Sequence, residues 1–130
     1  MPHVIVEYSS NIEAEVTPQS LLEDFHQAAI RTGVAEPVGV RTRLVRRDLY
    51  RVGDDGRDNA FVHIVARVRA GRPAEQKKAM LEALMAQANK TLAPAFAARG
   101  VALTVELHEI DPEYRLMRNG LRERSQSSAA

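Results

Sequence analysis

The chain has 130 residues, with 18 Lys and Arg against 17 Asp and Glu, a formal net charge of +1 and no cysteine. This length fits one domain with its own core and excludes two independent domains. The balanced charge argues against a nucleic-acid partner, and the lack of cysteine excludes disulfides, thiol nucleophiles and cysteine-ligated zinc. No stretch approaches the roughly 18 apolar residues of a membrane span, so we expect a soluble, cytoplasmic protein with no membrane partner.

The first half of the chain predicts a strand, a helix and a second extended segment. Residues 4–6 are all β-branched and directly follow Pro2, so they predict a short strand that is buried on both faces. The Thr-Pro pair at 17–18 is typical of a helix start, and apolar residues at helical spacing follow until Gly33 ends the helix. Residues 38–52 alternate apolar side chains with arginines, which predicts one long strand or two short ones.

Turn-forming residues separate this extended segment from the next one. Residues 53–59 combine two glycines with three aspartates and an asparagine. The run 60–68 behind them is rich in valine and isoleucine and reads as another strand. We therefore expect the segments 38–52 and 60–68 to pair with each other as a hairpin.

The remaining chain repeats the order of the first half. A Gly-Arg-Pro sequence at 71–73 predicts the start of a second helix, which Pro94 is expected to kink or shorten. Strict alternation of apolar and polar residues over 101–108 predicts a half-buried strand. We assign residues 1–124 to one domain and interpret 125–130 as a disordered tail.

Two βαβ halves in succession predict the architecture. A crossover helix implies parallel pairing of the two strands within each half. We therefore predict an α+β two-layer sandwich of two fused βαβ units, with four or more strands and two long helices on one face. The other face of the sheet then needs a cover, which we expect other copies of the chain to provide.

Pro2 is the residue best suited to unusual chemistry. An initiator methionine is commonly removed when a small residue follows it, which would leave a prolyl secondary amine at the chain end. An α-amino group titrates near about 8, and burial or neighbouring cations favour its neutral, basic form. The competing interpretation is that Pro2 only begins a strand, at a position that needs no backbone N–H.

Two arginines are candidates for binding an anion. Arg72 precedes the second helix, where free backbone N–H groups already favour negative charge, so a guanidinium there suits a bound carboxylate. Arg41 follows a small-residue turn and is a candidate for a second clamp. We interpret the others in the extended segments as solvated side chains: Arg43, Arg46, Arg47, Arg51, Arg67 and Arg69.

No spacing of ligating or phosphate-binding residues predicts a metal or a cofactor. His26, His63 and His108 are dispersed along the chain without a metal-ligand motif, and packing is the simpler interpretation of each. His3 adjoins Pro2 and is a candidate to line the same pocket, although neighbouring residues of a strand point to opposite faces.

Four short motifs resemble the 5-carboxymethyl-2-hydroxymuconate isomerase family of the tautomerase superfamily. They are 2–7 (PHVIVE), 39–43 (GVRTR), 60–63 (AFVH) and 71–72 (GR). The resemblance extends from Pro2 to about Glu109. It implies a βαββαβ subunit, a homotrimer and no cofactor.

The resemblance also implies a reaction. It implies a cofactor-free isomerase (tautomerase) that ketonises 5-carboxymethyl-2-hydroxymuconate or a similar dicarboxylated dienol during homoprotocatechuate breakdown. Pro2 would be the general acid and base, Arg41 and Arg72 would handle carboxylates, and His3 is a further candidate for substrate binding. The arginine-rich stretch 41–51 and the longer C-terminal tail depart from the family and leave the exact substrate open.

Two other kinds of function stay open. Another reaction of the superfamily on a small carboxylate, by a hydratase, dehalogenase or decarboxylase, would need an acid that activates water, such as Glu7, Glu106 or Glu109. The second open function is that of a noncatalytic βαββαβ module that binds RNA or a small ligand. An RNA-binding sheet carries aromatic residues among basic ones on its central strands, and Tyr8 and Phe61 are too few for this.

Overall fold

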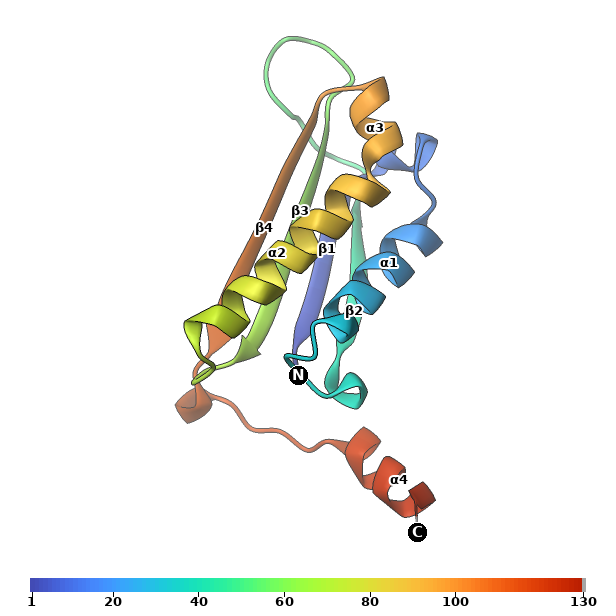
Figure 1. Cartoon of the computed structure of the whole chain (residues 1–130). Coiled ribbons are helices and arrows are strands. Elements are labelled where there is room, and N and C mark those ends of the chain that lie inside the picture. The colour runs from blue at the N-terminus through green and yellow to red at the C-terminus, as the bar shows by residue number, and fades with distance from the viewer. Residues whose placement is uncertain (130) are drawn as a thin grey trace.

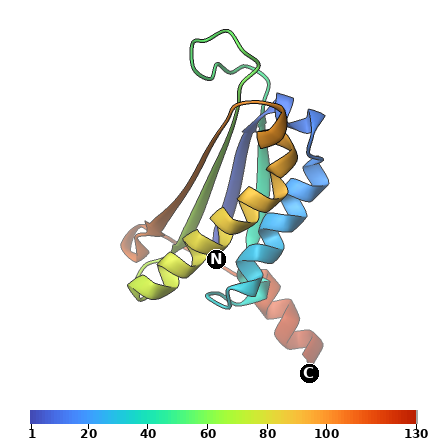
Figure 2. The same ribbon diagram turned by 45° about the horizontal axis from the view of Figure 1, so that its top comes forward.

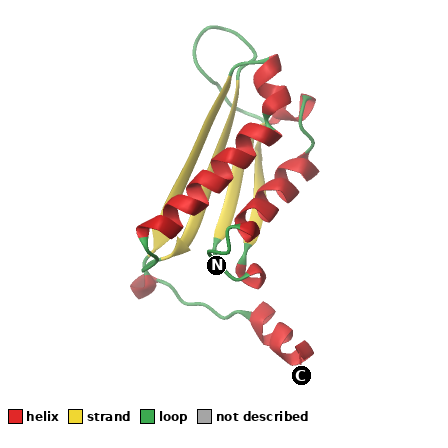
Figure 3. Ribbon diagram, in the orientation of Figure 1, coloured by secondary structure: helices red, strands yellow, loops and turns green. Residues whose placement is uncertain are grey.

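The computed structural model describes residues 1–129, in which a four-stranded sheet and two long helices form two layers (Figures 1 and 3). The main elements in chain order are β1 (His3–Ser9), α1 (Pro18–Arg31), β2 (Arg41–Arg47), β3 (Ala60–Arg69), α2 (Ala74–Thr91), α3 (Ala93–Ala98), β4 (Val101–Ile110) and α4 (Gly120–Ala129). Three short 3-10 helices join them: η1 (Ser10–Ala14), η2 (Pro37–Gly39) and η3 (Pro112–Tyr114).

The strands lie in the order β2-β1-β3-β4. β1 pairs with β2 and β3 pairs with β4 in parallel, as a crossover helix requires within each half. The two halves join where β1 and β3 run antiparallel. Both long helices lie against the same face of the sheet, as Figure 2 shows from a second direction. This arrangement confirms the predicted α+β sandwich of two fused βαβ units.

The predicted hairpin between residues 38–52 and 60–68 is wrong. β1 lies between β2 and β3, and residues 48–59 form the loop that connects them (Figure 1). The reason is burial, because alternate residues of β1 and of β3 are fully buried whereas no residue of β2 is. The sheet places its two apolar strands in the centre and the arginine-rich strand at an edge.

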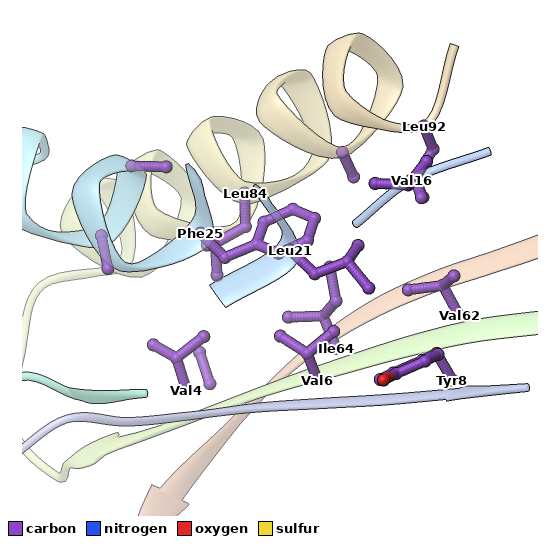
Figure 4. Packing of buried hydrophobic residues seen from close by; sticks show 14 of the residues in the cluster. Val4, Val6, Tyr8, Val16, Leu21, Phe25, Val62, Ile64, Leu84 and Leu92 are labelled. Carbon is purple, nitrogen blue, oxygen red and sulfur yellow. The ribbon is translucent and has the colours of Figure 1, made fainter. Parts of the chain in front are cut away.

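The hydrophobic core lies between the helices and the covered face of the sheet. Val4 and Val6 of β1 and Ile64 of β3 point towards Phe25 of α1 and Leu84 of α2, as Figure 4 shows. All five side chains have 0% of their surface exposed. This packing fixes the position of β1, and therefore of the amino terminus that directly precedes it.

The helix boundaries agree with the local sequence. The Thr17 Oγ1 accepts a hydrogen bond from the backbone N–H of Ser20 at 3.1 Å, and Gly33 follows α1 with a positive φ of 68°. Pro94 shortens the second helix as predicted, because α2 ends at Thr91 and α3 begins at Ala93. None of the helices in residues 1–129 has the length and hydrophobicity needed to cross a membrane.

The chain after β4 differs from the predicted disordered tail at 125–130. It crosses below the end of the sheet that holds the amino terminus and then forms α4 (Figure 1). The Asn119 side chain accepts hydrogen bonds from the N–H groups of Leu121 and Arg122 at 3.1 and 3.2 Å, so it caps this helix. Residues 125–129 are its second half, and Ala130 lies outside the described residues.

Candidate active site

The candidate site lies at one end of the sheet, where β1 and β2 begin and β3 and β4 end. We call this end of the strands the amino-terminal edge. The strand register places His3 opposite Arg41 on one side and opposite Arg67 on the other. Arg67 in turn lies opposite His108 of β4. Because paired residues of a sheet share a face, these four side chains lie on the face that the helices leave uncovered.

Met1 occupies the centre of this edge. It lines two cavities, a larger one of about 420 Å³ and a smaller one of about 260 Å³. Pro2 is buried behind it, and its carbonyl accepts a hydrogen bond from the backbone N–H of Arg41 at 3.0 Å. Gly39 packs closely on Met1, since a Cβ at this glycine would lie 3.0 Å from the Met1 carbonyl oxygen and 3.1 Å from its nitrogen.

Guanidinium groups line the larger cavity. Arg41, Arg43 and Arg67 come from the strands, and Arg115 and Arg118 come from the segment after β4, where Arg118 is paired with Glu123. The Arg43 Nη1 donates a hydrogen bond to the Nδ1 of His3 at 3.0 Å. Burial, followed by the charges of Arg43 and Arg41, lowers the pKa of His3 from 6.5, so this ring is neutral at pH 7.

The smaller cavity shares Met1 with the larger one and is also lined by arginines, together with Glu36. Arg69 follows from the end of β3 and Arg72 from the turn before α2. The Arg72 Nη1 donates to the backbone carbonyl of Val34, and its Nε is buried without a partner among the described residues. Arg122 of α4 also lines this cavity but is paired with Glu36.

Six of the arginines at this edge share one property. In the part of the chain that the structure describes, no carboxylate oxygen lies within 4.0 Å of their guanidinium nitrogens. The six are Arg41, Arg43, Arg67, Arg69, Arg72 and Arg115. Such a concentration of unpaired cations favours a ligand with more than one negative charge, and the planar guanidinium suits carboxylates.

The same charges act on the amino terminus. Burial is the largest cause, followed by the fields of Arg41, Arg69, Arg115 and Arg72, and together they lower the pKa of the Met1 amine from 8.0 to about 6. An amine at this position is therefore mostly neutral at pH 7. A neutral amine has a free electron pair and is able to accept a proton.

The structure brings the four predicted site residues to this one edge. Met1 directly precedes Pro2, His3 and Arg41 line the larger cavity, and Arg72 lines the smaller one. Sequence analysis missed four further arginines: Arg67 and Arg69, which like Arg43 we interpreted as solvated side chains, and Arg115. Antiparallel pairing of β1 with β3 would have placed the first two beside the amino terminus, but we expected β3 in a hairpin with residues 38–52.

The acids considered for activating water lie away from both cavities. The Glu7 Oε2 accepts from Arg47 at 2.8 Å, Glu106 lies 2.5 Å from His63, and the Glu109 Oε1 accepts from Lys77 at 3.2 Å. Within residues 1–129 no three His, Asp or Glu side chains are arranged to hold a metal ion. The chemical groups around Met1 are therefore guanidinium groups, the His3 ring and an amine, with the Glu36 carboxylate already paired with Arg122.

Comparison with known proteins gives one consistent family. The family described as 5-carboxymethyl-2-hydroxymuconate isomerase matches residues 2–125. The chain is 30% identical over 121 residues to the 5-carboxymethyl-2-hydroxymuconate Delta-isomerase of Escherichia coli. The aligned region covers 93% of this chain and 96% of the relative.

Solved structures agree with this match. The crystal structure of a 5-carboxymethyl-2-hydroxymuconate isomerase from Deinococcus radiodurans R1 has a TM-score of 0.80 and 28% identity, over 95% of this chain and 93% of that one. A fused 4-OT described as a wild-type symmetric trimer has a TM-score of 0.61 and 21% identity, over 89% and 93% of the two chains. The second similarity concerns the fold alone.

Proposed function

The chain belongs to the 5-carboxymethyl-2-hydroxymuconate isomerase family of the tautomerase superfamily, and on that premise we propose that Pro2 is its general acid and base. The substrate we propose is 5-carboxymethyl-2-hydroxymuconate, whose carboxymethyl group adds a third carboxylate to the two of muconate, or a similar dienol with at least two carboxylates. One observation carries this proposal: the amino terminus lies among six arginines that have no carboxylate partner in the described chain.

Removal of Met1 is the first requirement of the proposal. Met1 lines both cavities, and its loss would leave the Pro2 nitrogen as the chain end between them. The prolyl amine would then lie in the field of the arginines that already lower the pKa of the Met1 amine. A neutral secondary amine at that point has space for substrate on both sides.

The proposed reaction moves one proton. The neutral Pro2 nitrogen takes the proton from the enol hydroxyl, and the oxygen's electron pair forms the carbonyl while the double bonds shift along the chain. The terminal carbon of the shifted system then receives the proton from the prolyl ammonium, which returns to its neutral form. No redox step or group transfer occurs, so this reaction needs no cofactor.

The arginines have two proposed roles. Arg41 and Arg72 line two different cavities that share Met1, which suits a substrate with more than one carboxylate. Cations that are already in place also stabilise the negative charge that develops on the enol oxygen, without reorganising solvent. His3 is neutral and lines the same cavity as Arg41, so we propose that it contacts substrate as a hydrogen-bonding group.

The proposal also covers the oligomeric state of the protein, its location in the cell and the pathway in which it acts. We propose a cytoplasmic homotrimer that acts in homoprotocatechuate breakdown. The similar fold of the fused 4-OT trimer supports the trimer, as does a sheet whose second face has no cover in one chain.

The decisive test compares two preparations whose masses show Met1 removed or retained. We expect the processed protein to ketonise a dicarboxylated dienol, and the protein that retains Met1 to be slower by about 100-fold or more, as for loss of a general base. Circular dichroism and thermal unfolding provide the control that both preparations are folded. Equal activity of the two would show that Pro2 only begins a strand.

A further inference from the structure

Residues 115–119, which we call the strap, cross the mouth of the candidate site. Residues 115–118 line the larger cavity, and Met117 and Asn119 line the smaller one. Before the strap, the Asp111 side chain caps η3 by accepting from the backbone N–H of Glu113 at 2.9 Å. After the strap, α4 packs against η2, and this contact ties the strap to the body of the protein.

Arg115 is the more buried of the two arginines of the strap. It is half-buried, and its Nη1 lies 3.8 Å from the sulfur of Met1. Its Nε is fully buried and has no partner among the described residues. The nearby Arg118 differs, because its side chain is 85% exposed and is paired with Glu123. Both arginines of the strap line the larger cavity, and Arg115 is the one without a carboxylate partner among the described residues.

The surroundings of Arg115 lack an acceptor that matches its charge. A thioether sulfur is a weak hydrogen-bond acceptor, and removal of Met1 would take even this contact away. Arg41 and Arg67 line the same cavity and add positive charge. A partly buried guanidinium beside two others is unfavourable unless an anion compensates it. The cavity therefore suits a carboxylate at this point.

We infer that Arg115 binds the second carboxylate of the substrate, on the Arg41 side of the amino terminus, and so makes the enzyme prefer dicarboxylated over monocarboxylated dienols. The inference rests on the proposed function, because it requires a dienol bound between the two cavities. Arg115 lines only the larger cavity, whereas Arg72 on the other side serves the first carboxylate. A monocarboxylated dienol would leave one set of arginines unsatisfied.

The experiment compares Arg115→Gln, Arg115→Lys and the control Arg124→Gln in the processed full-length protein. With a dicarboxylated 2-hydroxydienoate, Arg115→Gln should lower kcat/KM by about 10- to 100-fold, mainly through KM, because a charge-assisted contact is lost. With the matched monocarboxylate we expect little change in kcat/KM, so the variant should lose its preference for the dicarboxylate. Arg115→Lys should recover only part of it, since lysine lacks the planar fork.

The control and a second readout separate binding from structure. Arg124 lies exposed on α4 and lines neither cavity, so its loss of one charge should leave both substrates unaffected. Arg115→Gln should also move the acidic limb of the pH–rate profile to higher pH, because one cation near the amine is gone. A merely structural role would lower both rates equally and leave that limb in place, which would overturn the inference.

A binding measurement keeps this inference distinct from the proposed function. If the processed protein isomerises neither dienol, the proposed function fails, whatever Arg115 does. Calorimetry with adipate and with hexanoate then tests Arg115 alone. Tighter binding of adipate that Arg115→Gln abolishes would support the inference, and equal affinity for the two compounds, or no binding, would contradict it.

Discussion

At the scale of single residues, the amino terminus shows how surroundings change an ordinary group. The Met1 amine has no special chemistry of its own, yet burial and four arginines lower its pKa from 8.0 to about 6. Two of these four, Arg41 and Arg72, were predicted from their local sequence. The other two, Arg69 and Arg115, reach the site only through strand pairing and the path of the chain after β4.

This field predicts the pH dependence of the reaction. In the processed chain we expect the pKa of the Pro2 amine to lie below its usual range, for the reasons that apply to Met1. The basic form of an amine exists above its pKa, so kcat/KM should rise with pH through this lowered value and then reach a plateau. A pH–rate profile of the processed enzyme, with its mass verified, measures the position of the limb.

Two variants make this prediction specific. Pro2→Ala leaves a primary amine in nearly the same place and should lower kcat/KM by about 100-fold or more, while the fold is kept. Arg41→Ala removes the largest single charge effect on the amine and should shift the limb to higher pH. A limb at the same pH in wild type and Arg41→Ala would mean that the titrating group is not the amino terminus.

At the scale of elements, the helices followed from local sequence and the strand order did not. Thr17, Gly33 and Pro94 mark helix ends through contacts within a few residues, so they are visible in the sequence. The turn formers at 53–59 correctly marked a loop, but a loop does not specify which strands pair. Pairing of β1 with β3 depends on burying both apolar strands in the centre, which is a long-range property of the sheet.

The short helix η2 leads to a testable prediction at this scale. Gly39 has an ordinary negative φ, so alanine is compatible with its backbone, but a Cβ there would meet the Met1 carbonyl oxygen at 3.0 Å. With Met1 retained, Gly39→Ala should destabilise the protein by about 1 to 3 kcal/mol through overpacking. With Met1 removed this contact no longer exists, and the substitution should be neutral or stabilise by up to about 1 kcal/mol.

Urea unfolding of four proteins measures this difference: wild type and Gly39→Ala, each with and without Met1. The comparison within each pair cancels any effect of Met1 itself on stability. An equal loss in both backgrounds would show that the alanine side chain meets something other than Met1. The same measurement reports how closely η2 and the amino terminus pack in the protein that retains Met1.

At the scale of the whole molecule, the uncovered face of the sheet combines apolar and paired charged groups. Ile5 and Val65 lie opposite each other in the middle of this face and are half-buried in the single chain. The charged neighbours are already paired within the chain, such as Glu7 with Arg47 and Glu106 with His63. Charges with a partner cost less to bury than isolated ones, so this face is suited to a second copy of the chain.

The last prediction concerns this face. Light scattering at micromolar concentration should give a mass of about three times the 14.4 kDa of one chain. Val65→Arg places an unpaired charge beside Ile5 and should reduce that mass to one chain, because burying an unpaired charge is costly. Leu22→Arg is the matched control, since Leu22 is 40% exposed on the helical layer and should leave the trimer intact. A wild-type monomer would contradict the trimer, and a trimer that withstands Val65→Arg but not Leu22→Arg would place the subunit contact elsewhere.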